Sequence, residues 1–283
     1  MATYLLGAGP LTYDIYEYFS SCGEQVFLVS QRSRVLSKSL HSMTYLEFCE
    51  RNINECDNLV IAWRSLDFTK DSSLLDKTLD FVMKKISIFN RVLYLSSGAI
   101  FGNSNFFFTE ESPSEPVSQY AIDKFSLENW LSALSMKNLV ILRISNAFGR
   151  KESNDLINRI SNAWLNDPIL EVYEPTSFAR DYMPIQVISK IVFHMLNQYK
   201  SLEVINYFNV SSGQVISTAE ILESFRAVRP SKIRVISEDI PEGIPRVFRI
   251  NNSKILEEFP SSRVDALGEI TNFFLAKIAS QHS

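Results

Sequence analysis

The sequence predicts an α/β fold: a doubly wound parallel sheet with helices on both faces, followed by a smaller C-terminal α/β lobe. In the first half of the chain, short apolar runs alternate with longer segments of helical periodicity. The runs are apolar throughout, which is typical of strands buried on both faces of a parallel sheet. The predicted strands are residues 3–6, 26–29, 59–63, 92–95 and 139–142.

The intervening segments have helical spacing. The first predicted helix carries Leu11, Ile15 and Phe19 on one face, directly after the first strand. Residues 1–150 are predicted to form the main domain and 151–283 mainly the smaller lobe, with a segment near 186–210 returning to the main domain. Further helices are predicted at 74–89, 117–136, 153–166, 186–199 and 217–227.

Composition excludes several classes of protein. The chain has 283 residues, 46% hydrophobic and 21% charged, which is ordinary for a globular protein. A net charge of −4 provides no basic surface for nucleic acid or an anionic membrane. No apolar run reaches the roughly 18 residues of a membrane span, and three cysteines without a CxxC pair predict no disulfide framework or zinc site. We expect a cytoplasmic protein without a metal.

A glycine-rich turn follows the first strand. Gly7 and Gly9 match the first two glycines of the GxGxxG dinucleotide fingerprint, while Thr12 takes the third position. In that fingerprint the pyrophosphate approaches the backbone at a helix N-terminus. Gly7, Gly9, Pro10 and Leu11 are therefore predicted to bind a dinucleotide. Ala62, at the end of a later strand, is included among the predicted cofactor contacts.

The end of the second strand bears on the choice of cofactor. An acidic residue there would accept hydrogen bonds from the ribose hydroxyls of NAD. The sequence instead reads Ser-Gln-Arg-Ser-Arg over residues 30–34, so Arg32 is predicted to contact the 2′-phosphate of NADP. NAD stays open as the alternative, because these arginines can equally be solvated loop charges.

Three polar residues form the predicted catalytic set. Ser97 leaves the strand at 92–95, and Tyr120 and Lys124 lie four residues apart on one face of the next long helix. A nearby ammonium favours the phenolate, so we expect Lys124 to lower the pKa of Tyr120 and allow proton exchange near neutrality. A Tyr–Lys pair alone is a weak signal, and its order after the glycine turn and Ser97 strengthens it.

This ordered set resembles the extended short-chain dehydrogenase/reductase superfamily, in its nucleotide-sugar epimerase, reductase and dehydratase branch. The resemblance covers most of the chain and implies a Rossmann-type fold with a substrate-binding lobe. It implies that Asn146, in an LRxxNxxG-like stretch, and Arg180, in an RDxxxV-like segment, contact the substrate's diphosphate. Arg246, in the loosest match, is a third predicted contact.

The resemblance also implies a mechanism. Tyr120 would exchange the proton of a sugar hydroxyl, Ser97 would hydrogen-bond the same oxygen, and Lys124 would also hold the nicotinamide ribose. Dehydratases of this branch carry an Asp-Glu pair after the catalytic hydroxyl residue, where this chain has Gly98-Ala99. Dehydration is therefore disfavoured.

The predicted function is reduction of a nucleotide-linked 4-keto-6-deoxy sugar by NADPH, a reaction that serves polysaccharide synthesis in such relatives. One alternative is a nucleotide-sugar 4-epimerase with tightly bound NAD. A second is a non-catalytic NADP-binding regulator. Many relatives are homodimers that pair two helices, and in this chain the helices 74–89 and 117–136 would do so.

Overall fold

The computed structural model describes residues 1–30, 41–64, 72–102, 107–150, 153–166, 169–173, 176–200, 205–231, 233–239 and 246–281. The chain divides into two compact units. Unit 1 comprises residues 1–100, 118–143 and 189–208, and unit 2 comprises residues 101–117, 144–188 and 209–283. The chain therefore crosses from one unit to the other several times.

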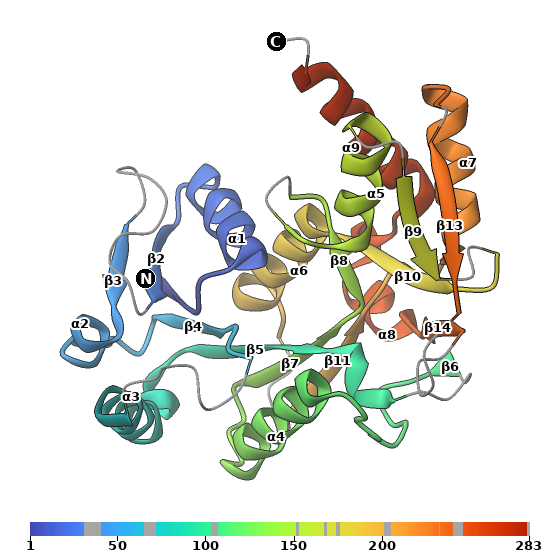
Figure 1. Ribbon diagram of the computed structural model, residues 1–283. Coiled ribbons are helices and arrows are strands. Elements are labelled where there is room, and N and C mark those ends of the chain that lie inside the picture. The colour runs from blue at the N-terminus through green and yellow to red at the C-terminus, as the bar shows by residue number, and fades with distance from the viewer. Residues whose placement is uncertain are drawn as a thin grey trace. The chain divides into compact units, whose positions relative to one another are not determined.

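Unit 1 is built on a seven-stranded sheet with the order β11-β7-β5-β4-β1-β2-β3 (Figure 1). The pairs β1–β2, β1–β4, β4–β5 and β2–β3 are parallel, as the uninterrupted apolar runs predict. The strands are β1 (Ala2–Leu6), β2 (Gln25–Ser30), β3 (Ser42–Thr44), β4 (Asn58–Ile61), β5 (Arg91–Ser97), β7 (Leu139–Ile144) and β11 (Asn206–Val210).

Helices cover both faces of this sheet. Figure 1 shows α1 and α6 on one face and α3 and α4 on the other, the arrangement of a doubly wound fold. Ring contacts between Phe193 and both Tyr18 and Phe19 join α6 to α1. The helices are α1 (Pro10–Ser21), α2 (Tyr45–Cys49), α3 (Ser72–Lys85), α4 (Gln119–Ala133) and α6 (Ile185–Asn197).

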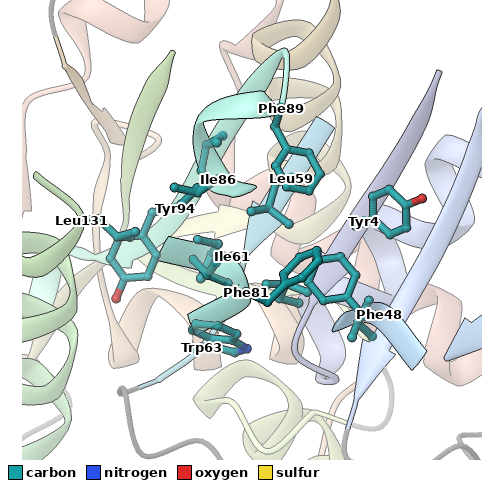
Figure 2. Close-up of a cluster of buried hydrophobic side chains, with 14 of the residues drawn as sticks. Tyr4, Phe48, Leu59, Ile61, Trp63, Phe81, Ile86, Phe89, Tyr94 and Leu131 are labelled. Atoms are coloured by element: carbon teal, nitrogen blue, oxygen red, sulfur yellow. The ribbon is translucent and has the colours of Figure 1, made fainter. Parts of the chain in front are cut away.

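One hydrophobic core of unit 1 lies between the sheet and the helices α3 and α4. Figure 2 shows side chains from the strands, such as Leu59, Ile61 and Tyr94, meeting Phe81 of α3 and Leu131 of α4. Full burial of one such side chain contributes about 1.5–3 kcal/mol relative to leaving it exposed. Packing of this apolar cluster holds the strands in place. It therefore also fixes the positions of the polar residues at the strand ends.

Unit 2 has its own mixed sheet and its own core. In the order β12-β10-β14-β6, β10 runs antiparallel to β12 and parallel to β14, and β8 also pairs with β10. A two-stranded parallel sheet joins β9 and β13. The strands are β6 (Phe107–Phe108), β8 (Asn146–Phe148), β9 (Ile169–Tyr173), β10 (Ala179–Pro184), β12 (Val215–Ser217), β13 (Arg234–Glu238) and β14 (Val247–Ile250).

The helices of unit 2 pack through aromatic side chains. The rings of Phe225 on α7 and Phe274 on α9 stack with centroids 4.0 Å apart, and Trp164 of α5 lies edge-on to both. Each of these side chains is almost fully buried. The helices are α5 (Leu156–Asn166), α7 (Thr218–Val228), α8 (Ser253–Glu258) and α9 (Ala266–Gln281).

Some predicted boundaries were wrong. The helix predicted at 117–136 begins at residue 119 because the Ser118 side chain accepts the Ala121 N–H at 3.2 Å and caps it. It ends at Ala133, shortly before Ser135, which has a φ of 51°. The helix predicted at 74–89 ends at Lys85 and continues as one 3₁₀ turn, Ile86–Ile88. Between β3 and β4 the chain also forms the short helix α2, which the sequence did not predict.

None of the helices in the described part of the chain is long and apolar enough to cross a membrane.

Candidate active site

The glycine turn lies where the strand order of the sheet reverses. The chain runs from β1 outward to β2 and β3 and then returns to β4 beside β1, and such switch points hold ligands in open α/β sheets. Gly7 has a φ of +113°, a backbone angle that residues other than glycine rarely adopt. A Cβ on Gly7 would lie 3.4 Å from the Ala62 carbonyl group, so the predicted residues Gly7 and Ala62 are neighbours.

The N-terminus of α1 follows directly from the glycine turn. Gly9 is the N-cap, Pro10 is the first helical residue and Leu11 follows in the first turn. Thr12 replaces the third glycine and is buried; its hydroxyl accepts the Gly9 N–H at 2.8 Å and donates to the Gly9 carbonyl at 2.9 Å. Threonine in place of the third glycine therefore stabilises the turn through two hydrogen bonds to the Gly9 backbone.

These residues fit a dinucleotide. A Cβ built on Gly9 meets nothing within 4 Å, so open space adjoins the backbone at the helix N-terminus, where N–H groups are unpaired within the helix. The cofactor contacts predicted at Gly7, Gly9, Pro10, Leu11 and Ala62 are thus placed together. Arg32, predicted to read the 2′-phosphate, lies outside the described residues.

The predicted catalytic residues come together at the end of β5 and the start of α4. A hydrogen bond joins the side chains of Ser97 and Tyr120. Tyr120 lies in the first turn of α4 and is 40% exposed, so a reactant can reach it. The Ser97 Oγ also accepts the Ala99 N–H at 3.2 Å, which orients the hydroxyl.

Lys124 lies one turn further along α4 and is buried. Its ammonium donates to the Leu95 carbonyl at 2.6 Å and to the Trp63 carbonyl at 2.8 Å, and it lies 5.1 Å from the centroid of the Tyr94 ring. Burial lowers the pKa of Lys124 to about 7, and the charge of Glu128 partly opposes this. The ends of two neighbouring strands thus hold a lysine that titrates near neutrality.

A buried charge network lies behind Lys124. Glu128, one further turn along α4, accepts from Arg143 Nε at 3.1 Å and Nη2 at 2.5 Å. Its other carboxylate oxygen accepts from Ser96 Oγ at 2.8 Å. Only 2% of Glu128 and 6% of Arg143 is exposed, so each charge depends on the other for compensation.

The pKa of Tyr120 is opposite in direction to the prediction. Burial raises it, while the hydrogen bond from Ser97 and the positive charge of Arg64 lower it in part. The ammonium of Lys124 is directed at the Leu95 and Trp63 carbonyls instead. Burial therefore outweighs the lowering that the i, i+4 spacing of Tyr120 and Lys124 predicts.

The predicted diphosphate contacts all lie in unit 2, and they differ in exposure. Arg180 is buried, stacks on Phe178 with its Cζ 3.7 Å from the ring centroid, and donates to the Ala179 carbonyl at 2.8 Å and the Arg246 carbonyl at 3.0 Å. Arg246 is exposed and donates to Ser177 Oγ at 3.1 Å. Asn146 is exposed and donates to the Asp181 carbonyl at 2.9 Å. Arg180 and Arg246 are thus neighbours.

The sequence interpretation missed four charged residues that the structure gives defined partners. Arg64 lies beside Tyr120, and Glu128 and Arg143 form the buried pair. Asp181 is fully buried and accepts from Ser212 and Gly213. Spacing could have revealed Glu128, which lies eight residues after Tyr120 on the same face of the helix.

No group of acidic, histidine or cysteine residues that could hold a metal is present among the residues the structure describes.

Sequence comparison assigns the family. The model of the NAD dependent epimerase/dehydratase family matches residues 42–211, and the chain belongs to this family of enzymes. An ADP-L-glycero-D-manno-heptose-6-epimerase from Brachyspira hyodysenteriae is 27% identical over 190 residues, which cover 62% of this chain. The match spans 56% of that relative's length.

Solved structures share the fold. A UDP-glucose-4-epimerase from Stenotrophomonas maltophila, with bound NAD and formylated UDP-arabinopyranose, superposes with a TM-score of 0.80 over 100% of both chains at 15% identity. MoeE5 in complex with UDP-glucuronic acid and NAD gives a TM-score of 0.78 over 98% of this chain and 100% of that chain at 16% identity. These likenesses confirm the predicted Rossmann-type α/β fold.

Proposed function

We propose that this chain is a nucleotide-sugar epimerase that oxidises and re-reduces one carbon of the sugar with tightly held NAD. The observation that carries the proposal is the hydrogen-bonded Ser97–Tyr120 pair beside the buried Lys124. Two further findings support the proposal. One relative is an epimerase, and the similar solved structures contain NAD together with a nucleotide sugar. This ranks the epimerase ahead of the ketoreductase that the sequence alone favoured.

The protein's part in the reaction is to move a proton and orient the reactants. The glycine turn and Ala62 would hold NAD, which would supply the chemistry of hydride removal from the sugar carbon and hydride return to it. Tyr120 takes the proton of the sugar hydroxyl and later returns it. Ser97 hydrogen-bonds the same oxygen and stabilises its charge, while Lys124 would hold the nicotinamide ribose.

The diphosphate contact is assigned to exposed residues of unit 2. Arg246 and Asn146 present exposed side chains, and a guanidinium forks well onto phosphate oxygens. Arg180 was predicted for the same role, but its guanidinium is buried against Phe178 and donates to backbone carbonyls. We therefore assign Arg180 to holding the Arg246 backbone in place.

An NADPH-dependent ketoreductase is the second candidate. The sequence 30–34 lacks a carboxylate and contains Arg32, which favours NADP. Denaturing the freshly purified protein and identifying the released nucleotide separates the two functions. Retained NAD supports the epimerase, whereas an empty site that prefers NADPH over NADH supports the ketoreductase.

A homodimer through α3 and α4 stays a prediction that gel filtration tests.

Tyr120→Phe tests the catalytic role. We expect it to lower turnover of UDP-sugars such as UDP-glucose or UDP-glucuronic acid by roughly 10²–10⁴-fold, because proton transfer is lost, while NAD binding is unchanged. Tyr18→Phe on α1 is the matched control and should keep full turnover. Turnover retained in Tyr120→Phe would contradict the proposal and favour the non-catalytic regulator.

A further inference from the structure

An arginine next to the catalytic tyrosine is not accounted for by the proposed chemistry. Arg64 follows β4, and its Cζ lies 5.6 Å from the centroid of the Tyr120 ring. The side chain of Arg64 is 60% exposed, whereas that of Asp123, its partner, is 19% exposed. The guanidinium is therefore open to solvent on one side and anchored on the other.

We propose that Arg64, anchored by Asp123, is a positioning residue that favours the ionised form of Tyr120. Arg64 Nε donates to Asp123 Oδ2 at 3.2 Å, and Gln119 Nε2 donates to Asp123 Oδ1 at 2.8 Å. Asp123 lies three residues after Tyr120, so the two side chains are neighbours on the surface of α4. The pair thus fixes a positive charge beside the tyrosine ring.

The other charged groups around Tyr120 do not supply this effect. Lys124 on α4 is turned toward the Leu95 and Trp63 carbonyls. Asp123 on α4 has the wrong sign of charge to stabilise the phenolate, and Tyr94 on β5 is a phenol whose pKa burial raises, so it carries no positive charge. Of the charged residues near Tyr120 in the described part of the chain, Arg64 has the sign and place to stabilise the phenolate, and its charge does lower the pKa of Tyr120.

The consequence for catalysis rests on the proposed function, in which Tyr120 exchanges a proton with the sugar. A tyrosine whose pKa lies far above the working pH is a poor base. By opposing the effect of burial on the pKa of Tyr120, Arg64 increases the fraction of phenolate and so raises the rate of the proton step. The ionisation of Tyr120 itself is measurable without any turnover, so the two claims can fail separately.

The test is an NMR pH titration of protein labelled with ¹³C at tyrosine Cζ. The Tyr120 signal is the one that disappears in Tyr120→Phe. We expect Arg64→Gln to lower the acid ionisation constant of Tyr120 by roughly two- to tenfold, as for a unit charge near 6 Å in a partly solvated site. Arg64→Lys keeps the charge and should restore most of the loss.

Arg51→Gln is the matched control. Arg51 is also an exposed arginine of unit 1 stacked on an aromatic ring, with its Cζ 4.5 Å from the centroid of Phe27. Its removal changes the net charge equally and should leave the Tyr120 signal unmoved. Because both arginines are exposed, we expect both variants to fold, which near-ultraviolet circular dichroism checks.

Three results would overturn the proposal. One is an unchanged ionisation constant in Arg64→Gln, and another is an equal fall in Arg64→Gln and Arg64→Lys. The third is a wild-type Tyr120 that does not titrate before the protein unfolds in alkali. Suppose instead that the ionisation constant of Tyr120 falls in Arg64→Gln as expected while the wild-type protein turns over none of the nucleotide sugars. That result would contradict the proposed function and leave the role of Arg64 intact.

Discussion

Each unit buries one cation at a predicted site, and the two cations differ in what surrounds them. Lys124 in unit 1 and Arg180 in unit 2 both donate to two backbone carbonyls. Lys124 has the carboxylate of Glu128 one turn away, whereas Arg180 stacks on the ring of Phe178. Burial lowers the pKa of Lys124 to about 7 and that of Arg180 to about 10.

Under the proposed function, this difference separates a reactive group, Lys124, from a structural one, Arg180. A lysine with a pKa near 7 can change its charge in the working range, so its environment can be tuned by bound molecules. Arg180, with a pKa of about 10, stays charged at neutral pH and donates to the backbone carbonyls of Ala179 and Arg246. Motif matching alone assigned both residues to function, and the surroundings of each now distinguish them.

The largest expected effect on stability is at Glu128. Glu128→Gln leaves the guanidinium of Arg143 buried without its counter-charge, and we expect a loss of about 3–5 kcal/mol in the free energy of unfolding. Urea denaturation measures it. Because Glu128 also opposes the lowering of the Lys124 pKa, the variant should lower that pKa further.

The exposed pair of Asp80 and Lys84 on α3 is the control for Glu128. Its N–O distance is 2.7 Å, but the side chains are 59% and 70% exposed. Asp80→Asn should therefore cost less than about 0.5 kcal/mol. An equally small cost in Glu128→Gln would show that the buried pair does not stabilise unit 1.

A second comparison distinguishes Arg180 from Arg246. Arg180→Met keeps the stem but removes the charged hydrogen bonds to the Ala179 and Arg246 carbonyls, and we expect a loss of about 2 kcal/mol in unfolding free energy. Arg246→Met should cost less than about 0.5 kcal/mol because the side chain is exposed. Affinity for UDP, measured by calorimetry, should fall mainly in Arg246→Met. A loss of affinity in Arg180→Met without a loss of stability would reverse this assignment.

A pH dependence from Asp181 has about the same expected size as the loss in Arg180→Met. Burial raises its pKa to about 6, although the N–H groups of Ser212 and Gly213 and the Ser212 hydroxyl lower it in part. The folded state therefore holds a proton between about pH 4 and pH 6 that the unfolded chain releases. This contribution to stability is complete below about pH 4 and is lost as the pH rises through 6.

Urea unfolding of wild type and Asp181→Asn from pH 4 to 7 measures the effect. The wild-type free energy should fall by about 2 kcal/mol more than that of the variant over this range. Subtracting the two curves removes the other titrating groups. Parallel curves would show that the carboxylate of Asp181 does not titrate between these values.

The glycine turn and the Ser97, Tyr120 and Lys124 set were predictable because they follow elements with clear periodicity. A strand end or one helix turn fixes where such a side chain lies relative to its neighbours. Glu128, Arg143 and Asp181 were not found, because a charged residue is exposed by default and long-range packing alone decides that it is buried. The direction of the Tyr120 pKa was wrong for the same reason, since sequence spacing does not report burial.

By itself, the sequence determined the parallel sheet, the glycine turn and the order of the predicted catalytic residues. These depend on local periodicity, on the conformational freedom of glycine and on chain order. Tertiary structure alone decided that Lys124 points at two strand-end carbonyls, that Arg180 is buried and that Arg64 lies against Tyr120. Those outcomes depend on which segments distant in sequence pack together, and burial and electrostatic interaction act through space rather than along the chain.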